Sequence, residues 1–200
     1  MTTAPSGTSR RTTLLTWGLV VAALVVGQAI EQHLPDPQDA ARAFQRNGSV
    51  GTVVPLRIGD LEVTGVTGAT SAAGSFGGFK SPGIVIVASF RFTARTETAS
   101  INSGVLTGAG DHTFTIGPAG SRGGITCIAS QPGIPVECSV SVEAPQNALP
   151  GATLSLGGSS DDRFDDLAVV DLGISGAEAA RWATGTDPVK VPDAHPLGLK

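Results

Sequence analysis

The chain has 200 residues, of which 40% are apolar and 15% are charged, and its formal net charge at pH 7 is −4. The apolar share allows one domain with a hydrophobic core, whereas the low charge argues against a charged coiled coil or a charged disordered tail. An acidic chain without a basic stripe gives no support for nucleic-acid binding, so no nucleic-acid partner is expected.

The first predicted element is a transmembrane signal anchor over residues 12–30. This run of 19 residues carries no charge, and a helix of that length measures about 28 Å, close to the hydrocarbon thickness of a bilayer. Arg10 and Arg11 precede the run. The positive-inside bias therefore predicts that residues 1–11 are cytoplasmic and that the C-terminal part of the chain is extracytoplasmic.

Two other interpretations compete with an anchor. A cleaved signal peptide needs small residues before its cleavage site, and Val25 and Gly27 before Gln28 offer a partial match. A buried soluble helix would be shorter or amphipathic, unlike residues 12–30. The length and the flanking charges favour the uncleaved anchor, which predicts a single-pass protein of the cell membrane.

Beyond the anchor, the sequence predicts a stalk and then a β-sandwich. Residues 31–50 contain Pro35, Pro37 and several alanines, a composition typical of a stalk or linker. From residue 51 to residue 175, short alternating runs are punctuated by Gly and Pro, which indicates an all-β fold. Seven to nine strands over this length fit an immunoglobulin-like antiparallel β-sandwich.

Period-two alternation is clearest over residues 84–95. One face of this predicted strand is entirely apolar, which indicates one face in the core and an opposite face partly in water. Its apolar face consists of Ile84, Ile86, Ala88, Phe90, Phe92 and Ala94. Similar runs lie at 54–58, 61–64, 136–143, 153–156 and 167–174.

The segment Gly65–Gly83 is the poorest in large apolar residues. Its composition of Gly, Ala, Ser and Thr is typical of a mobile surface loop. The functional alternative is a binding loop at the edge of the sandwich, with Phe76 and Phe79 as exposed anchors.

Residues 176–200 predict a short helix followed by an extended C-terminal tail. Ser175 and Glu178 have the spacing of a capping box, which marks the start of the helix. Trp182 on this helix is expected to cover the sandwich rather than to bind a ligand. Three prolines after residue 184 favour an extended tail.

Cys127 and Cys138 are the two cysteines of the chain. A type II turn at Gln131–Ile134, with Pro then Gly at its centre, would place the cysteines opposite each other in a hairpin. The same register pairs Ile125 with Val140 and Ala129 with Val136. The sequence therefore predicts a structural disulfide, since a catalytic Cys-x-x-Cys spacing is absent and two cysteines without nearby histidines cannot complete a zinc site.

Catalytic signals are sparse. The chain has no Gly-x-Ser-x-Gly elbow near a histidine, and Asp111-His112-Thr113 is expected to be an exposed turn. The densest acidic cluster is expected to be a solvated turn, although its carboxylates could also attract a hard cation such as Ca²⁺. The cluster consists of Asp161, Asp162, Asp165 and Asp166. No catalytic, cofactor-binding or metal-binding residue and no cofactor is predicted.

Three stretches carry a resemblance to a known family. They are Gly51–Thr64, Gly83–Phe92, and Leu149–Leu154 followed by Arg163–Gly173. In these stretches the chain resembles the immunoprotective-extracellular, immunoglobulin-like superfamily and its membrane-anchored relatives of unknown function in GC-rich Gram-positive bacteria. The resemblance implies a small sandwich outside the membrane and no established catalytic residues.

Two functional hypotheses follow. The first is a membrane-tethered, non-enzymatic domain with an accessory or protein-interaction role at the cell envelope, held in the membrane by residues 12–30 and bound to an envelope protein. The second is a cleaved, secreted ligand-binding module that uses the Gly65–Gly83 loop or the Asp161–Asp166 turn. A hydrolase that uses His112 is a distant third.

Overall fold

The structure is a computed structural model of the whole chain. It describes residues 10–31, 43–74, 77–117, 123–159 and 165–198. In the first of these ranges, side chains are described from Leu15 onward. Contacts divide the chain into two compact units, Met1–Ala41 and Arg42–Lys200.

The described part of the N-terminal unit is the helix α1 (Arg10–Glu31). All of its described side chains are exposed, including Leu15, Trp17 and Leu24. Among the described residues, no helix has the length and apolarity needed to cross a membrane.

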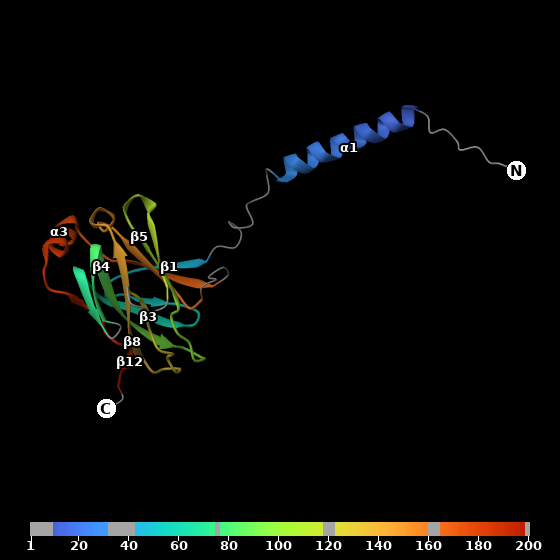
Figure 1. Cartoon of the computed structure of the whole chain (residues 1–200). Coiled ribbons are helices and arrows are strands. Elements are labelled where there is room, and N and C mark those ends of the chain that lie inside the picture. The colour runs from blue at the N-terminus through green and yellow to red at the C-terminus, as the bar shows by residue number, and fades with distance from the viewer. Residues whose placement is uncertain (1–9, 32–42, 75–76, 118–122, 160–164, 199–200) are drawn as a thin grey trace. The chain divides into compact units, whose positions relative to one another are not determined.

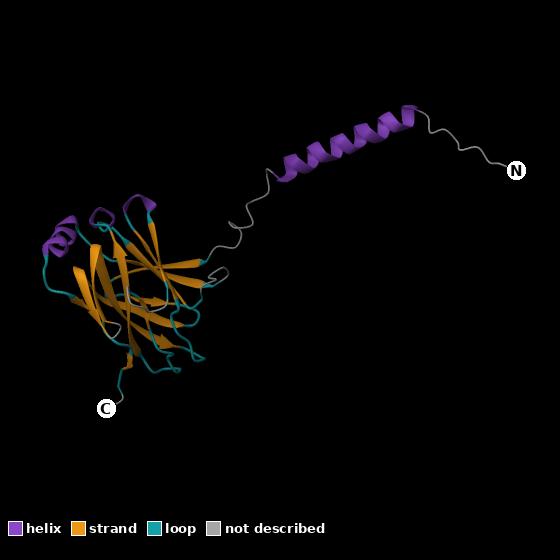
Figure 2. Ribbon diagram, viewed as in Figure 1, coloured by secondary structure: helices purple, strands orange, loops and turns teal. Residues whose placement is uncertain are grey.

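The second unit consists of two sheets, as expected for a β-sandwich (Figures 1 and 2). The first sheet has the strand order β1 (Phe44–Ser49), β10 (Asp166–Asp171), β9 (Thr153–Gly157), β5 (Ser103–Thr107) and β6 (Thr113–Ile116). The second has the order β11 (Val189–Lys190), β3 (Gly59–Gly74), β4 (Gly77–Ala94), β8 (Val136–Ala144) and β12 (His195–Pro196). Two further strands join the second sheet, β2 (Val53–Pro55) on β3 and β7 (Gly124–Thr126) on β8.

Within residues 51–175, the described strands are β2 to β10, nine in all, which agrees with the seven to nine that the sequence predicts for this range, whereas β1, β11 and β12 lie outside it. Four of the strands, β2, β7, β11 and β12, have only two or three residues each. Most pairings are antiparallel, whereas β1 with β10 and β11 with β3 are parallel. Helical elements cap the ends of strands: η1 (Ala109–Asp111), η2 (Gln146–Ala148) and α3 (Gly176–Thr184).

The core lies between the two sheets and confirms the predicted alternation. The apolar face of residues 84–94 is at most 1% exposed, and Phe90 and Phe92 are fully buried. The facing sheet contributes Leu154, Leu156 and Val170. Burying a large apolar side chain contributes about 1.5–3 kcal/mol, so this central layer dominates the stability of the domain.

The opposite face of β4 differs from the prediction. Val85 and Val87 were expected to be partly wet, yet they are 0% and 3% exposed. A second apolar cluster forms on the outside of the second sheet, where Phe79, Val189 and Val191 pack against them. The covering residues come from distant parts of the chain, so local alternation does not reveal this burial.

The predicted stalk over residues 31–50 is wrong at its C-terminal end. Phe44–Ser49 forms β1, which pairs with β10 in a register from Phe44 opposite Asp166 to Ser49 opposite Asp171. Most side chains of β1 are exposed. Backbone hydrogen bonds to β10, rather than an apolar pattern, therefore make this segment a strand.

The predicted mobile loop Gly65–Gly83 is also wrong. Its residues continue β3 and begin β4, which pair as one long hairpin down to Gly74 opposite Gly77. Phe79 is half-buried in the second apolar cluster rather than exposed, and Phe76 lies outside the described residues. Small side chains leave the backbone free to form the ladder, so this segment is part of the sheet and not a binding loop.

The disulfide between Cys127 and Cys138 is confirmed, with their Cα atoms 4.7 Å apart. The predicted register also holds, because Ile125 lies opposite Val140. At the turn, the Ile134 N–H donates to the Gln131 carbonyl at 3.0 Å, and Gly133 has a φ of 75°, the positive value that a type II turn requires at its third residue.

The hairpin is shorter than predicted, since β7 ends at Thr126 and Ala129 does not pair with Val136. Ser130 draws the chain away from the ladder. Its buried hydroxyl accepts from the Ala94 N–H at 2.9 Å and donates to the Ile134 carbonyl at 2.7 Å.

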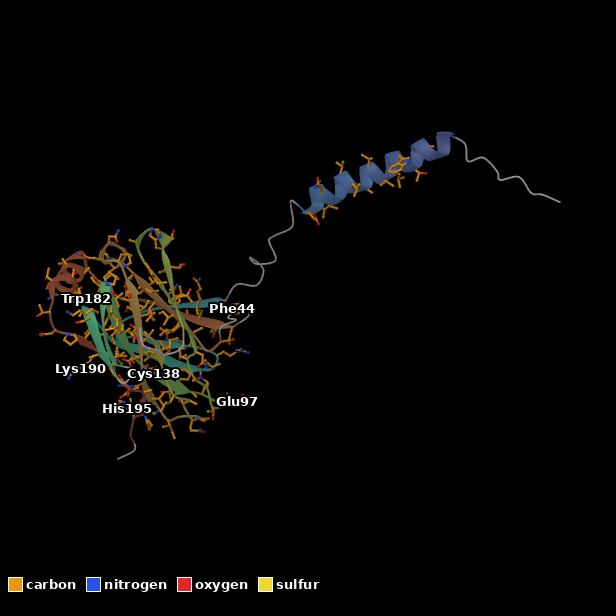
Figure 3. All side chains as sticks on the ribbon, viewed as in Figure 1. Phe44, Glu97, Cys138, Trp182, Lys190 and His195 are labelled. Carbon is orange, nitrogen blue, oxygen red and sulfur yellow. A yellow bond between two sulfur atoms is a disulfide. The ribbon has the colours of Figure 1, made fainter. Side chains whose placement is uncertain are left out.

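The capping box of α3 is confirmed: the Glu178 N–H donates to the Ser175 hydroxyl, and the Ser175 N–H donates to the Glu178 carboxylate. Trp182 packs against the core (Figure 3), as predicted. The segment after α3 is extended, but it is not a free tail. Residues 185–198, named here the C-terminal strap, add β11 to one edge of the second sheet and β12 to the other.

Candidate functional site

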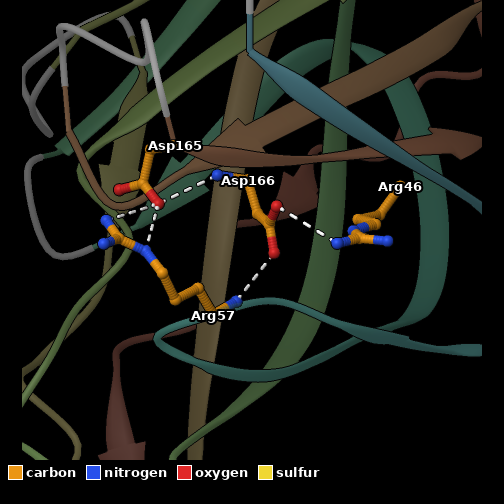
Figure 4. Close-up of polar contacts among 4 residues, drawn as sticks. All are labelled: Arg46, Arg57, Asp165 and Asp166. Atoms are coloured by element: carbon orange, nitrogen blue, oxygen red, sulfur yellow. Dashed lines mark hydrogen bonds and ion pairs between the residues drawn. The ribbon is translucent and has the colours of Figure 1, made fainter.

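The described part of the acidic turn, Asp165 and Asp166, forms ion pairs rather than an open cluster of carboxylates. The Arg57 guanidinium donates to Asp165 from Nε at 3.1 Å and from Nη2 at 2.9 Å, and the Arg57 N–H donates to Asp166 at 2.9 Å (Figure 4). Arg46 approaches the other Asp166 oxygen at 3.5 Å. We name these four residues the arginine–aspartate clamp. It joins the β2–β3 turn to the start of β10, so its carboxylates are neutralised by cations of the protein.

The remaining acidic residues of the predicted cluster, Asp161 and Asp162, lie outside the described residues. Within the described ranges, no group of three His, Cys, Asp or Glu residues is placed to hold a metal ion.

The structure does not bring the two described histidines together. His112 is exposed in the turn between β5 and β6, whereas His195 is exposed in β12 on the other sheet (Figure 3), and His33 lies outside the described residues. The turn of His112 contains Gly110 and Asp111, both with positive φ. An exposed turn at Asp111-His112-Thr113 is therefore confirmed.

The structure instead offers a groove along β6 that the sequence analysis did not identify. Three hollows of about 750, 690 and 410 Å³ meet at Phe114. Two of them follow the strand from the turn before Thr113 to Gly117. The 690 Å³ hollow extends from Phe114 to Gly83 on β4 and Ala183 on α3. We name this combined feature the β6 groove.

The floor and walls of the groove come from both sheets. Phe114 lies opposite Leu106 in the ladder and packs at the margin of the core, half-buried. Thr113 and Thr115, its neighbours on the strand, are exposed. The opposite wall is formed by the end of β8 with Glu143 and by Pro145.

A glycine shapes one end of this wall. A Cβ on Gly83 would lie 2.8 Å from the Ala144 carbonyl oxygen, closer than real Cβ atoms come to a backbone oxygen. The absence of a side chain at Gly83 therefore lets this part of β4 lie directly against the end of β8, beside the 690 Å³ hollow.

The charged groups that line the groove are negative. Its described lining residues include two carboxylates, Glu143 and Asp111, and one imidazole, His112, but neither lysine nor arginine. An apolar floor with a few polar groups at its rim is typical of a binding site. This arrangement can hold a ligand.

No protein-family model, curated protein or solved structure matches the chain.

Proposed function

We propose that the chain is a membrane-tethered, extracytoplasmic, immunoglobulin-like domain with a non-enzymatic, protein-interaction role at the cell envelope. The observation that carries the interaction role is the β6 groove, a set of open hollows around Phe114 that combine apolar and polar lining residues. Fold alone does not determine function, so the proposed interaction role is argued mainly from the groove.

The strand order supports the immunoglobulin-like part of the proposal. Immunoglobulin sandwiches have strands A, B, E and D in one sheet and G, F and C in the other, with C′ beside C in variable-type domains. Here β3, β4, β8 and β7 are neighbours in the second sheet, and β10, β9, β5 and β6 are neighbours in the first. In the proposed immunoglobulin-like assignment, β3 to β10 correspond in chain order to strands A, B, C, C′, D, E, F and G.

The proposed tether rests on the sequence. The tether is the uncharged run over residues 12–30, which begins at Thr12. The described side chains of α1 begin three residues later, so they cover only part of this run. The disulfide supports an extracytoplasmic location, because disulfides persist in oxidising compartments and are rare in the cytosol.

The first test is the intact mass of the native protein from membranes and from medium, with and without reduction. A full-length mass in the membrane fraction, two hydrogens lighter before reduction, is the expected result. A truncated mass in the medium would overturn the tether and favour the secreted ligand-binding module.

The second test addresses the interaction. In full-length protein in its native cells, a photoactivatable residue replaces Thr115 on β6. The matched control carries the same residue in place of the exposed Glu97. Glu97 lies far from Trp182 in the domain (Figure 3). We expect a discrete protein adduct from position 115 that position 97 does not give. The same adducts from both positions, or none from 115, would overturn the interaction role.

A further inference from the structure

We propose that the C-terminal strap (residues 185–198) is a releasable cover of the second sheet, which opens as one unit while the sandwich beneath it stays folded. Opening controls access to the outer apolar cluster, which the strap hides when it is closed. The inference goes beyond the proposed function and does not depend on the β6 groove, because none of the described lining residues of the groove belongs to the strap.

The burial of side chains separates the strap from the core. Every residue of the strap is half-buried or exposed, and none is buried. The main core cluster contains no residue of the strap. Val189 and Val191 pack instead on the separate outer cluster, whose Val85 and Val87 are buried. Opening would therefore uncover a small apolar face and leave the central layer between the two sheets intact.

Few hydrogen bonds hold the two ends of the strap. At one end, β11 pairs two residues with β3, and the Val191 N–H donates to the Ala73 carbonyl at 2.9 Å. At the other end, β12 pairs two residues with β8, and the Leu197 N–H donates to the Pro135 carbonyl at 2.8 Å. Three residues of the strap are prolines, which have no N–H to contribute to a ladder.

Ser139 holds the middle of the strap. Its hydroxyl donates to the Pro192 carbonyl at 2.7 Å. Ser139 is buried beneath the strap, whereas Pro192 is exposed, so the carbonyl can exchange this bond for one with water on opening. Each of the three attachments is too short to hold alone against the conformational entropy of an ordered chain. We therefore expect the two ends and the middle to form and break together.

The hinge is the segment between α3 and β11. α3 stays on the core, because Ala179 is buried and Trp182 packs against the main cluster. Residues 185–188, which follow α3, are all exposed. The contact printed by the geometry at this point is a bond of 3.4 Å from the Thr70 hydroxyl to the Gly185 carbonyl. Rotation about this segment releases the rest of the strap without moving α3.

The test is native-state hydrogen exchange of the full-length, isotopically labelled protein in detergent micelles, with urea raised to concentrations below the global transition. The reporters are the amides of Val191 and Leu197, at the two ends of the strap. The references are the slowest amides of β4 and β9, which lie in the interior of the two sheets. Opening of the strap exposes little surface, so its amides should respond weakly to urea, whereas the reference amides should respond strongly.

We expect the Val191 and Leu197 amides to have the same protection, roughly 100-fold or more below that of the reference amides. Val170→Ala in the core should lower the protection of the reference amides and leave that of the strap amides unchanged. Val170 is buried in the main cluster, which contains no strap residue, so its packing is the same whether the strap is open or closed.

Ser139→Ala should lower the protection of both strap amides together, by roughly two- to tenfold, because the closed state loses one hydrogen bond. Ser141→Ala is the matched control and should leave the protection of the strap amides unchanged. Ser141 is a buried serine of the same strand, and its hydroxyl lies 3.0 Å from the position of a Cβ on Gly123.

Strap amides that are as protected as the reference amides, and that lose protection with them in urea or in Val170→Ala, would show that the strap opens only when the domain unfolds. Unequal protection of Val191 and Leu197 would show that the two ends open separately, and protection at neither would show that the strap is not closed. Each of these results would overturn the inference. None of them changes the adduct expected from Thr115, so the proposed function is tested separately.

Discussion

At the residue scale, the contact between Gly68 and Trp182 shows how closely α3 lies against the sandwich. A Cβ on Gly68 would lie 2.6 Å from Trp182 Cε3 and 3.1 Å from Ile84 Cγ2. The indole ring therefore occupies the space that any other side chain on β3 would need at this position. Gly68 is required by this close approach rather than by an unusual backbone angle.

We expect Gly68→Ala to displace the indole and to lower the free energy of unfolding by about 1–3 kcal/mol, as overpacking does. Urea unfolding followed by fluorescence in a Trp17→Phe background measures this, because Trp182 is then the remaining tryptophan. Gly65→Ala is the matched control, since its Cβ would meet nothing within 4 Å. Equal stability of the two variants would contradict the prediction.

Glu178 gives a pH-dependent prediction. The Ser175 N–H and hydroxyl donate to its carboxylate at 3.0 and 2.9 Å and, with a smaller contribution from Arg181, hold the pKa of Glu178 below its ordinary value. A lowered pKa in the folded state stabilises the protein above the unfolded-state pKa, and this contribution is lost as the pH falls through the folded-state pKa.

The Tm of wild type should therefore exceed that of Glu178→Gln at neutral pH, and the difference should shrink as the pH falls below the lowered pKa. Calorimetry across this range measures it. A difference that stays constant into acid would show that the carboxylate charge plays no part in capping α3.

At the scale of elements, the disulfide joins the end of β7 to β8 across a separation of 11 residues. Closing a loop of this length in the unfolded chain contributes about 3 kcal/mol in the chain-entropy model. We expect reductant to lower the free energy of unfolding of wild type by about this amount. Cys127→Ala/Cys138→Ala is the control, and its stability should not respond to reductant. A response of equal size in that variant would contradict the assignment.

The arginine–aspartate clamp makes a prediction about calcium. Asp165 and Asp166 already accept from Arg57, and Arg46 approaches the same site. A hard cation would have to displace these guanidinium groups before it could bind. We expect millimolar Ca²⁺ to leave the Tm unchanged, with Mg²⁺ as the ionic-strength control. A rise with Ca²⁺ alone would restore a cation site at this turn.

The outcome for individual elements shows which part of the fold is local in the sequence. The strand over residues 84–95 and the hairpin of the cysteines were predictable because alternation and turn residues act over a few positions. Phe44–Ser49 and Gly65–Gly74 were not, because both are strands through pairing with a partner that the sequence does not identify. The β6 groove was missed for the same reason. Phe114 is visible in the sequence, but the edge position of its strand depends on the order of the whole sheet.

At the scale of the whole molecule, the C-terminal strap crosses the outside of the second sheet. β11 pairs with Ala72 and Ala73 on one edge, and β12 pairs with the start of β8 on the other. Between them, the buried Ser139 hydroxyl donates to the Pro192 carbonyl at 2.7 Å. The strap thereby covers the outer apolar cluster and shortens the exposed length of both edges.

Deletion of residues 187–200 should expose Val85 and Val87 together with two strand edges, a combination that promotes association. We expect stronger binding of an apolar dye and a larger mass in size-exclusion chromatography with light scattering. Lys190→Ala is the control, because its exposed side chain (Figure 3) can be removed while the backbone pairs remain. A monomeric, dye-free deletion variant would show that the strap is dispensable for burial.

The pairing of chain ends also sets an order in time. β1 must wait for β10, whose register partners lie 122 positions later in the chain, from Phe44 to Asp166, and the second sheet gains its last strand only with Pro196. Sequence-distant pairings form slowly, whereas the cysteine hairpin is local and can form early. A chain synthesised from its N-terminus therefore passes most of its length as an unfinished sandwich, and the second sheet gains its last described strand only when Pro196 emerges.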